Sequence, residues 1–305
     1  MSIEGDPTPG QPGAVLMETG PERAFGISLA LADGPEIVAA MPSGPHLRGP
    51  AGLPPGGAVG VLIDNSLGVA IMLRRPANLW SVSAEISLDL CRALPSDGSP
   101  IVARSRHVHA GPHAGFAEGT VTDSAGRMLA TCRQHGRWVT TLPPGLASAT
   151  DQTEAPSPPD APSASEALAA PDAPPSPLDA PSAPDLAALL GARLRPTEGG
   201  AQLELDVTPD VVNPLGNLHG GITFAACDLV AQAALKAAGG PVQTASIRVA
   251  YPRPIPAGTV PRFDARVVHR GRVLGVVEVR VTVDGVKPRV VATITTCLPD
   301  RDGDD

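Results

Sequence analysis

Two aspartates, Asp64 and Asp228, each lie inside a run of apolar residues that follows a Gly-Gly pair. The second run, at 220–235, is apolar on almost every side and therefore predicts a helix surrounded by protein. A carboxylate inside such a helix is costly unless it is paired or hydrogen-bonded. Buried carboxylates also supply bases with perturbed pKa values. A narrow polar stripe at a subunit interface is the structural alternative, but an aspartate at both equivalent positions favours a chemical role.

The Gly-Gly pairs, Gly56 with Gly57 and Gly220 with Gly221, begin both predicted helices. Glycine lets a substrate carbonyl approach the free N-terminal amides, where the helix dipole favours negative charge, so an oxyanion hole is possible. A tight strand-to-helix turn would also need such glycines. Asp228 lies eight residues beyond Gly220, about 12 Å along one helix. An amide and a carboxylate can therefore meet at one carbon only if two antiparallel helices face each other.

These helices belong to two similar halves of the chain. PGGAVGVLIDNSLGVAIML at 55–73 matches HGGITFAACDLVAQAAL at 219–235, and HAGPHAGFAE at 109–118 matches HRGRVLGVVE at 269–278. The segments after each helix alternate apolar and polar residues and are rich in β-branched side chains, which predicts strands. The expected fold is α+β, with a long central helix in each half wrapped by an antiparallel β-sheet.

Composition divides the 305 residues into five segments. Residues 144–184 are almost entirely Pro, Ala, Ser and Asp, which predicts an extended linker without a core. We therefore expect a disordered N-terminus at 1–20, a first domain at 21–143, a second domain at 185–299 and an acidic tail at 300–305.

Charge and cysteine content exclude several classes of function. The net charge of −8 argues against nucleic acid as a partner, and the four cysteines form no CxxC pair. No signal peptide or membrane span of about 20 residues is evident, so we expect a cytoplasmic protein.

His107, His109 and His113 have no Cys or carboxylate pair to complete a zinc site. We expect no metal and no organic cofactor.

The segment NPLGNLHGGITFAACD at 213–228 resembles the signature of hotdog-fold thioesterases of the PaaI type. That family has an Asn, then HGG, then an Asp seven residues after the second Gly. The resemblance is specific over about 185–298 and weaker over about 21–141. It implies two hotdog domains side by side, a double hotdog.

The resemblance also implies roles for individual residues. The Gly220 amide would polarise a thioester carbonyl, supported by Gly221, while Asn213 and His219 would position that carbonyl. An aspartate of the partner domain would act as nucleophile or activate water. A hydroxyl early in the next strand would hold the water or the carboxylate. The candidates for this hydroxyl are Ser246 in the second half and Ser83 or Ser81 in the first.

The two halves depart from the signature unequally. Aligning the two aspartates places Gly49 opposite Asn213 and Pro55 opposite His219. One composite site, built from Asn213, His219 and Gly220 with Asp64 and a first-half serine, is complete. The other combines Gly56 with Asp228 and Ser246, and it lacks two polar groups. We therefore expect one good site, at the start of the second helix.

The sequence thus predicts an acyl-CoA thioesterase that hydrolyses its substrate to the free acid and CoA. Acyl-CoA is the expected partner, and double-hotdog chains could associate into a homo-oligomer. A non-catalytic acyl-CoA or lipid-binding module is the main alternative, because Pro55 and Gly49 weaken one site. A hotdog enoyl-CoA hydratase is a lesser one, since neither aspartate is followed by the His that such an enzyme would use.

Overall fold

The computed structural model describes residues 19–31, 36–144, 185–240 and 242–298. The predicted N-terminal segment, linker and acidic tail lie almost entirely outside the described residues. The last residue of the predicted N-terminal segment, Gly20, is described and begins helix α1.

Each half contributes one main helix and six strands. The first half contains α1 (Gly20–Ala24), β1 (Ser28–Leu31), β2 (Glu36–Pro42), the 3₁₀ turns η2 (Pro45–Leu47) and η3 (Gly56–Val59), α2 (Gly60–Met72), β3 (Trp80–Leu90), β4 (Pro100–Ala110), β5 (Ala114–Thr122) and β6 (Met128–Val139). The second contains α4 (Leu186–Leu189), β7 (Ala192–Thr197), β8 (Gly200–Leu205), the 3₁₀ turn η6 (Pro209–Val211), α5 (Gly220–Ala238), β9 (Gln243–Ala250), β10 (Arg262–Arg270), β11 (Leu274–Thr282) and β12 (Val290–Cys297).

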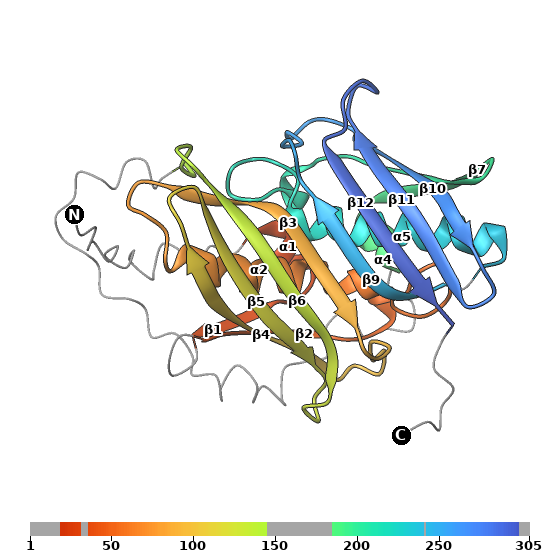
Figure 1. The fold of residues 1–305 in the computed structure, drawn as a ribbon, viewed down its shortest axis with the longest axis horizontal. Coiled ribbons are helices and arrows are strands. Elements are labelled where there is room, and N and C mark those ends of the chain that lie inside the picture. The colour runs from red at the N-terminus through yellow and green to blue at the C-terminus, as the bar shows by residue number, and fades with distance from the viewer. Residues whose placement is uncertain (1–18, 32–35, 145–184, 241, 299–305) are drawn as a thin grey trace.

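The strands form one twelve-stranded sheet in the order β1-β2-β4-β5-β6-β3-β9-β12-β11-β10-β8-β7. Read from each edge toward the middle, both halves have the same strand order. They join where β3 and β9 pair antiparallel, from Glu85 opposite Ala250 to Asp89 opposite Ser246. Figure 1 shows the two halves side by side, with the strands in front of the helices. The α+β layout expected from the sequence is confirmed.

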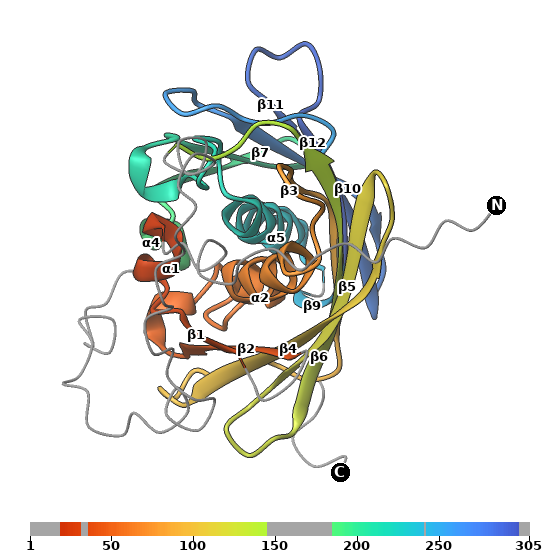
Figure 2. The same ribbon diagram turned by 90° about the vertical axis from the view of Figure 1, so that its left-hand side faces the viewer.

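The sheet curves around α2 and α5, which lie on its concave side, while α1 and α4 lie at the open side (Figure 2). The two long helices touch at their starts: a Cβ on Gly60 would lie 2.5 Å from the Gly221 carbonyl oxygen. One continuous apolar core includes residues of both halves. Helix α5 is long and apolar enough to span a membrane, but 78% of its apolar window is buried inside the protein, so its composition fits a core helix.

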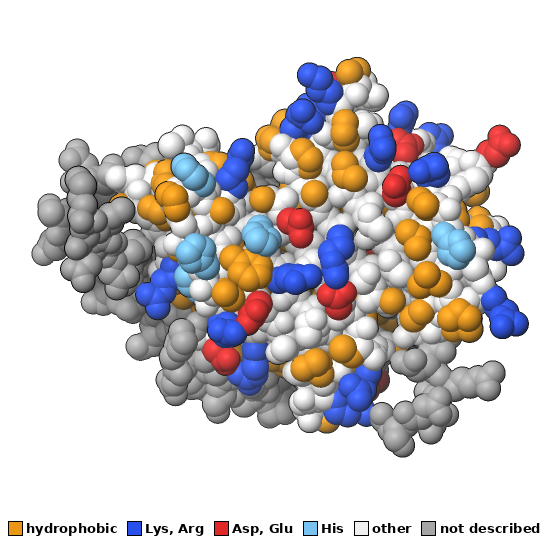
Figure 3. Space-filling view, viewed as in Figure 1, with side chains coloured by type: hydrophobic (Ala, Val, Ile, Leu, Met, Phe, Trp, Pro, Cys, Tyr) orange, Lys and Arg blue, Asp and Glu red, His pale blue; other side chains and the backbone are white. Residues whose placement is uncertain are grey.

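The outer face of the sheet carries both charged and hydrophobic side chains. Figure 3 shows acidic and basic side chains mixed over the middle strands. Arg248 bonds to Asp89 at 2.8 Å across the junction of the halves, and Arg106 pairs with Glu118. The helices therefore cover the apolar face of the sheet, and the opposite face meets solvent.

Two irregularities at the middle of the sheet decide which side chains face the helices. The register of β3 shifts between Ser83 and Glu85, and that of β9 shifts opposite the step from Thr295 to Thr296. A β-bulge of this kind inserts one residue and reverses the alternation of faces. As a result Ser83 and Thr244, which precede the bulges, point toward the helices.

Candidate active site

Asp64 lies in the middle of α2, opposite the start of α5, with only 8% of its surface exposed. Its Oδ2 atom accepts a hydrogen bond from the backbone N–H of Gly221 at 2.8 Å. A Cβ on Gly220 would lie 2.7 Å from the same oxygen, so only glycine leaves room for the carboxylate there. The antiparallel helices thus bring the amide end of one helix to the aspartate of the other, as the helix-length argument required.

The other oxygen of Asp64 is held by two side chains of the first half. The Ser83 hydroxyl donates to Oδ1 at 2.8 Å, and the Gln134 amide donates to Ser83 at 2.8 Å and to Oδ1 at 3.3 Å. Ser83 was one of the two predicted serines, and the structure brings it to Asp64. The other, Ser81, bonds to neither oxygen of Asp64. Both oxygens of the carboxylate are therefore fixed by donors.

His219 is the N-cap of α5 and lies between two carboxylates. Its Nδ1 atom accepts from the Gly221 N–H at 3.0 Å and lies 3.3 Å from Asp64 Oδ2, while Nε2 lies 3.3 Å from Glu22 Oε1. Burial opposes the charged imidazolium, but the hydrogen bond to Glu22 and the charges of Asp64 and Glu22 raise the pKa of His219 overall. The geometry therefore points Nε2–H at Glu22 and Nδ1 at the helix start.

Glu22 comes from α1, where it forms a capping box with Thr19. It is buried, and its Oε1 atom also accepts from the Asn65 amide at 3.0 Å. Burial disfavours its charge, yet the hydrogen bond and charge of His219 and the Thr19 hydroxyl lower the pKa of Glu22 to about 2. A carboxylate that the sequence analysis did not identify thus orients the predicted histidine.

Asn213 lines the site but its oxygen is occupied by a turn. Its Oδ1 atom accepts from the backbone N–H groups of Leu215 at 3.0 Å and Asn217 at 3.2 Å. The Asn213 side chain therefore shapes the loop before α5, and its amide group remains to contact a ligand. Tyr251 supports the same region, because its hydroxyl donates to the Gly220 carbonyl at 2.9 Å; burial raises its pKa.

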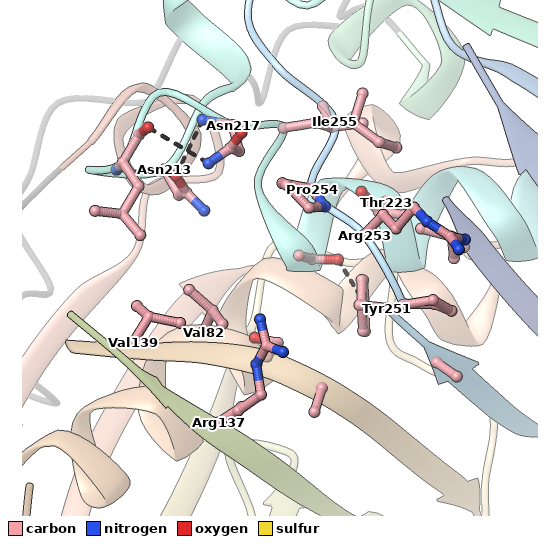
Figure 4. Close-up of a pocket in the computed structure, with 18 of the residues that line it drawn as sticks. Val82, Arg137, Val139, Asn213, Asn217, Thr223, Tyr251, Arg253, Pro254 and Ile255 are labelled. Atoms are coloured by element: carbon pink, nitrogen blue, oxygen red, sulfur yellow. Dashed lines mark hydrogen bonds between the residues drawn. The ribbon is translucent and has the colours of Figure 1, made fainter. Parts of the chain in front are cut away.

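Two cavities meet at the start of α5. The larger, of about 540 Å³, is lined mainly by apolar side chains of both halves, with Arg137 and Arg253 also in its wall (Figure 4). The smaller, of about 110 Å³, is lined by Asp64, Glu22 and His219 among others. The residues that line both cavities are Val82, Ser83, Asn213 and Gly220. A bound group could therefore extend from one cavity past Gly220 into the other.

Asp228, Gly57 and Thr244 form a second centre, the Asp228 centre, which repeats the hydrogen bonds of the Asp64 centre around a fully buried carboxylate. The Gly57 N–H donates to Asp228 Oδ2 at 2.8 Å, and the Thr244 hydroxyl bonds to both carboxylate oxygens, at 3.0 Å and 2.8 Å. Asp228 is fully buried, and neither cavity at the Asp64 centre includes it. Burial raises its pKa to about 6, although the bonds from Gly57 and Thr244 oppose that shift.

The prediction of Ser246 as the hydroxyl of the Asp228 centre is wrong. Thr244 takes that place, and Ser246 pairs with Asp89 and Thr295 in the sheet. The bulge in β9 is the cause, because it reverses the face on which residues after it point. Ordinary alternation along the strand gave no sign of the bulge.

The first turn of each long helix also differs. His219 caps α5, whereas the corresponding Pro55 has no side-chain acceptor and the first turn there is the 3₁₀ segment Gly56–Val59. The Gly56 N–H is bonded to Thr244 Oγ1 at 3.3 Å, and a Cβ on Gly56 would lie 2.6 Å from Leu90. The space that is open beside Gly220 is therefore filled beside Gly56.

Family models of thioesterases match both halves of the chain. Residues 215–288 match the family model of the thioesterase superfamily, and residues 46–137 match that of the acyl-CoA thioesterase C-terminal domain. No curated protein matches the sequence significantly. These matches support hydrolysis of an acyl thioester in general.

Solved structures share the fold. A tesB protein from Mycobacterium avium subspecies paratuberculosis is 13% identical with a TM-score of 0.58, covering 93% of this chain and 100% of its own. A 12:0-ACP thioesterase from Umbellularia californica is 12% identical with a TM-score of 0.54, covering 86% and 94%. A protein named as a thioesterase from Novosphingobium aromaticivorans is 18% identical with a TM-score of 0.55, covering 89% and 98%. The hotdog fold predicted from the sequence is confirmed.

Proposed function

We propose that this protein is an acyl-CoA thioesterase with one working active site, at Asp64. The observation that carries the proposal is the contact of the Asp64 carboxylate with the Gly221 N–H at 2.8 Å, beside the start of α5. It brings a carboxylate and the amide end of a helix dipole to one place, where Asp64 lines the smaller cavity and Gly220 lines both.

In this proposal the thioester carbonyl lies beside Gly220, and its developing negative charge meets the Gly220 amide. No hydrogen bond from that amide to another described residue is present. Preorganised amides aimed at a developing oxyanion contribute about 10²–10³ in rate. The Asn213 amide and His219 help to place the carbonyl.

Asp64 acts as the nucleophile or as the base that activates water. Ser83, Gln134 and Gly221 hold the carboxylate in one orientation, which favours a reactive geometry. With Asp64 as the base, it takes a proton from water, and the water oxygen bonds to the carbonyl carbon. The carbon–sulfur bond breaks, and the proton passes to the thiolate to give CoA and the free acid. With Asp64 as the nucleophile, its oxygen bonds to the carbonyl carbon and the thiolate leaves from an acyl anhydride. Water then cleaves this anhydride to the free acid and the Asp64 carboxylate, and the proton released neutralises the thiolate. A carboxylate base of this kind contributes about 10²–10⁴ in rate.

Coenzyme A as the leaving group is supported by the larger cavity. Its volume of about 540 Å³ suits a pantetheine arm, and the exposed side chains of Arg137 and Arg253 stand in its wall. A guanidinium at this place would attract the phosphates of the nucleotide. The reaction needs no metal or organic cofactor in this proposal.

The test is thiol release from a panel of short, long and aromatic acyl-CoAs by the wild type, Asp64→Asn and Asp228→Asn. We expect release by the wild type and by Asp228→Asn, and loss of about 10²–10⁴ in kcat/KM for Asp64→Asn. Activity that survives Asp64→Asn but not Asp228→Asn would contradict the assignment of the site. Binding of acyl-CoA without any release would instead establish a non-catalytic binding module.

A further inference from the structure

The smaller cavity follows one face of helix α2. Asp64, Gly68 and Met72 all line this cavity of about 110 Å³. Residues four positions apart lie on the same side of a helix, so the three form one stripe. The stripe is about 12 Å long, with Gly68 about 6 Å from either end. No residue that lines the cavity is exposed, so the space extends from the carboxylate along the helix and beneath the protein surface.

Gly68 leaves the middle of this stripe open. A Cβ on Gly68 would meet no atom of a described residue within 4 Å, so close packing does not require glycine there. Its backbone does not require glycine either, because Gly68 is not among the residues with positive φ. Glycine inside a helix is less stable than alanine, since it loses more backbone freedom on folding. The feature that glycine supplies at this position is therefore the open space itself.

Met72 bounds the cavity at the end opposite Asp64. Its Sδ atom accepts from the Ser81 N–H at 3.2 Å, so the Met72 side chain connects α2 to the start of β3. Both residues line the cavity, and only 5% of the surface of Met72 is exposed. A flexible apolar side chain therefore closes the far end.

The second half of the chain fills the corresponding place. Gln232 follows Asp228 by four positions, as Gly68 follows Asp64. The Gln232 side chain is buried, and its amide donates to Thr244 Oγ1 at 3.1 Å. One half therefore has a long side chain one turn beyond its aspartate, and the other has none. The half without the side chain is the one whose aspartate lines a cavity.

The proposed function places the start of an acyl chain at this stripe. With the CoA arm in the larger cavity, the acyl group enters the smaller one, because Ser83 and Gly220 line both. From Asp64 the chain reaches Gly68 after about 6 Å, which is about four or five carbon–carbon bonds. An acetyl group therefore ends before Gly68, whereas a hexanoyl chain reaches it.

We infer that Gly68 determines which acyl chains this protein accepts, by opening the space that a chain enters one helical turn beyond Asp64. This inference rests on the proposed thioesterase function. A side chain at position 68 would exclude chains that reach this turn but would not meet an acetyl group. Chains much longer than the stripe would meet Met72.

The test compares kcat/KM for acetyl-, hexanoyl- and palmitoyl-CoA. We expect the wild type to prefer hexanoyl-CoA to acetyl-CoA by about tenfold or more, because each methylene held in a pocket changes kcat/KM by about tenfold or more. Palmitoyl-CoA should be poorer than hexanoyl-CoA. Palmitoyl-CoA as the best of the three would overturn the inference, since the cavity that ends at Met72 could not hold that chain.

Three variants locate this preference. Gly68→Leu should lower the ratio of hexanoyl-CoA to acetyl-CoA turnover by about tenfold or more, and Gly68→Ala by about threefold. Gln232→Ala changes the same helix position at the Asp228 centre, and the ratio should stay within about twofold of wild type. A ratio of two substrates does not depend on how much of the enzyme is folded. If Gly68→Leu is too inactive to measure, Gly68→Ala decides, because alanine favours the helix.

Two results from these variants would overturn the inference. An unchanged ratio in the Gly68 variants would place the acyl chain outside the smaller cavity, while hydrolysis itself would leave the proposed function standing. An equal change in Gln232→Ala would attribute the effect to general loosening of the two helices. Failure of the proposed function has a different sign, because the wild type would then hydrolyse none of the short, long or aromatic acyl-CoAs.

Discussion

The Asp64 centre and the Asp228 centre share their backbone geometry and differ in access. In each, a helix-start amide donates at 2.8 Å to the aspartate of the opposite helix, and a strand hydroxyl bonds to the same carboxylate. Beside Asp64, however, His219 and two cavities adjoin the helix start, whereas Leu90 and Thr244 close in on Gly56.

The hydrogen bonds between the helices are therefore not themselves evidence of catalysis. The same contact joins the halves at Asp228. Asp228, however, lines neither of the two cavities that meet at the start of α5. Access and a polar partner for the substrate separate the two centres.

The first prediction concerns the glycines at the two helix starts. Gly220→Ala places a methyl group 2.7 Å from Asp64 Oδ2 and should displace the carboxylate, which lowers kcat/KM by about 10²–10³. The equivalent change, Gly56→Ala, meets mainly the flexible end of Leu90, and we expect kcat/KM within about threefold of wild type. Similar losses in both variants would show that the centres are equally important.

The second prediction uses the pH dependence of stability. The pKa of Asp228 is raised from 3.8 to about 6 in the folded protein, so the fold favours its neutral form. Its stabilising contribution is present below about pH 4 and is lost as the pH rises toward about 6. Relative to Asp228→Asn, the wild type should lose about 3 kcal/mol of unfolding free energy between about pH 4 and 8.

Urea unfolding of the two proteins at several pH values measures this difference. The Asn side chain does not titrate, so it removes the effect of this one group. A difference between wild type and Asp228→Asn that stays constant from acid to neutral pH would mean that Asp228 has an ordinary pKa.

The third prediction concerns Glu22 and His219, which exist as a pair only at the Asp64 centre. In the wild type, the charges of Glu22 and Asp64 raise the pKa of His219. Glu22→Gln removes the charge 3.3 Å from His219 Nε2, so the pKa of His219 should be lower in this variant than in the wild type. The titration midpoint of His219 by NMR should move to lower pH, and kcat/KM should fall about tenfold because the imidazole is less well oriented.

Thr19→Ala is the matched control for this pair. It removes the hydrogen bond from the Thr19 hydroxyl to Glu22 but keeps the Glu22 charge, so the His219 midpoint should move much less. An equal shift of the midpoint in Thr19→Ala and Glu22→Gln would attribute the effect to the position of α1 rather than to charge.

The smallest expected effects come from the two strand hydroxyls. Ser83→Ala should lower kcat/KM about fivefold to tenfold, since one hydrogen bond to Asp64 contributes about 1 kcal/mol. Thr244→Val should leave kcat/KM within about twofold but lower the unfolding free energy by about 1–3 kcal/mol, because Asp228 stays buried with fewer donors. Kinetics and urea unfolding on both variants test this, and a reversal of the two outcomes would exchange the roles of the centres.

Much of this arrangement could be inferred from residue order. The apolar run around Asp64 and Asp228 predicted two core helices, and the length of one helix required a second, antiparallel one to bring carboxylate and amide together. Pro55 in place of His219 predicted that the two sites would be unequal. The inferences about the two helices succeed because helix geometry and the cost of burying a charge are local rules, whereas unequal activity of the two sites stays a prediction.

The tertiary structure alone decided the remaining partners. Gln134 and Glu22 reach the site from β6 and α1, 70 residues beyond Asp64 and 42 residues before it, and no spacing connects them. The bulge in β9 placed Thr244 rather than Ser246 at Asp228. The small cavity is lined by residues of α1, α2, β3, β6 and the start of α5. Residue order therefore determined which groups could react, while strand register and packing decided which of them share a cavity, because these depend on contacts between distant segments.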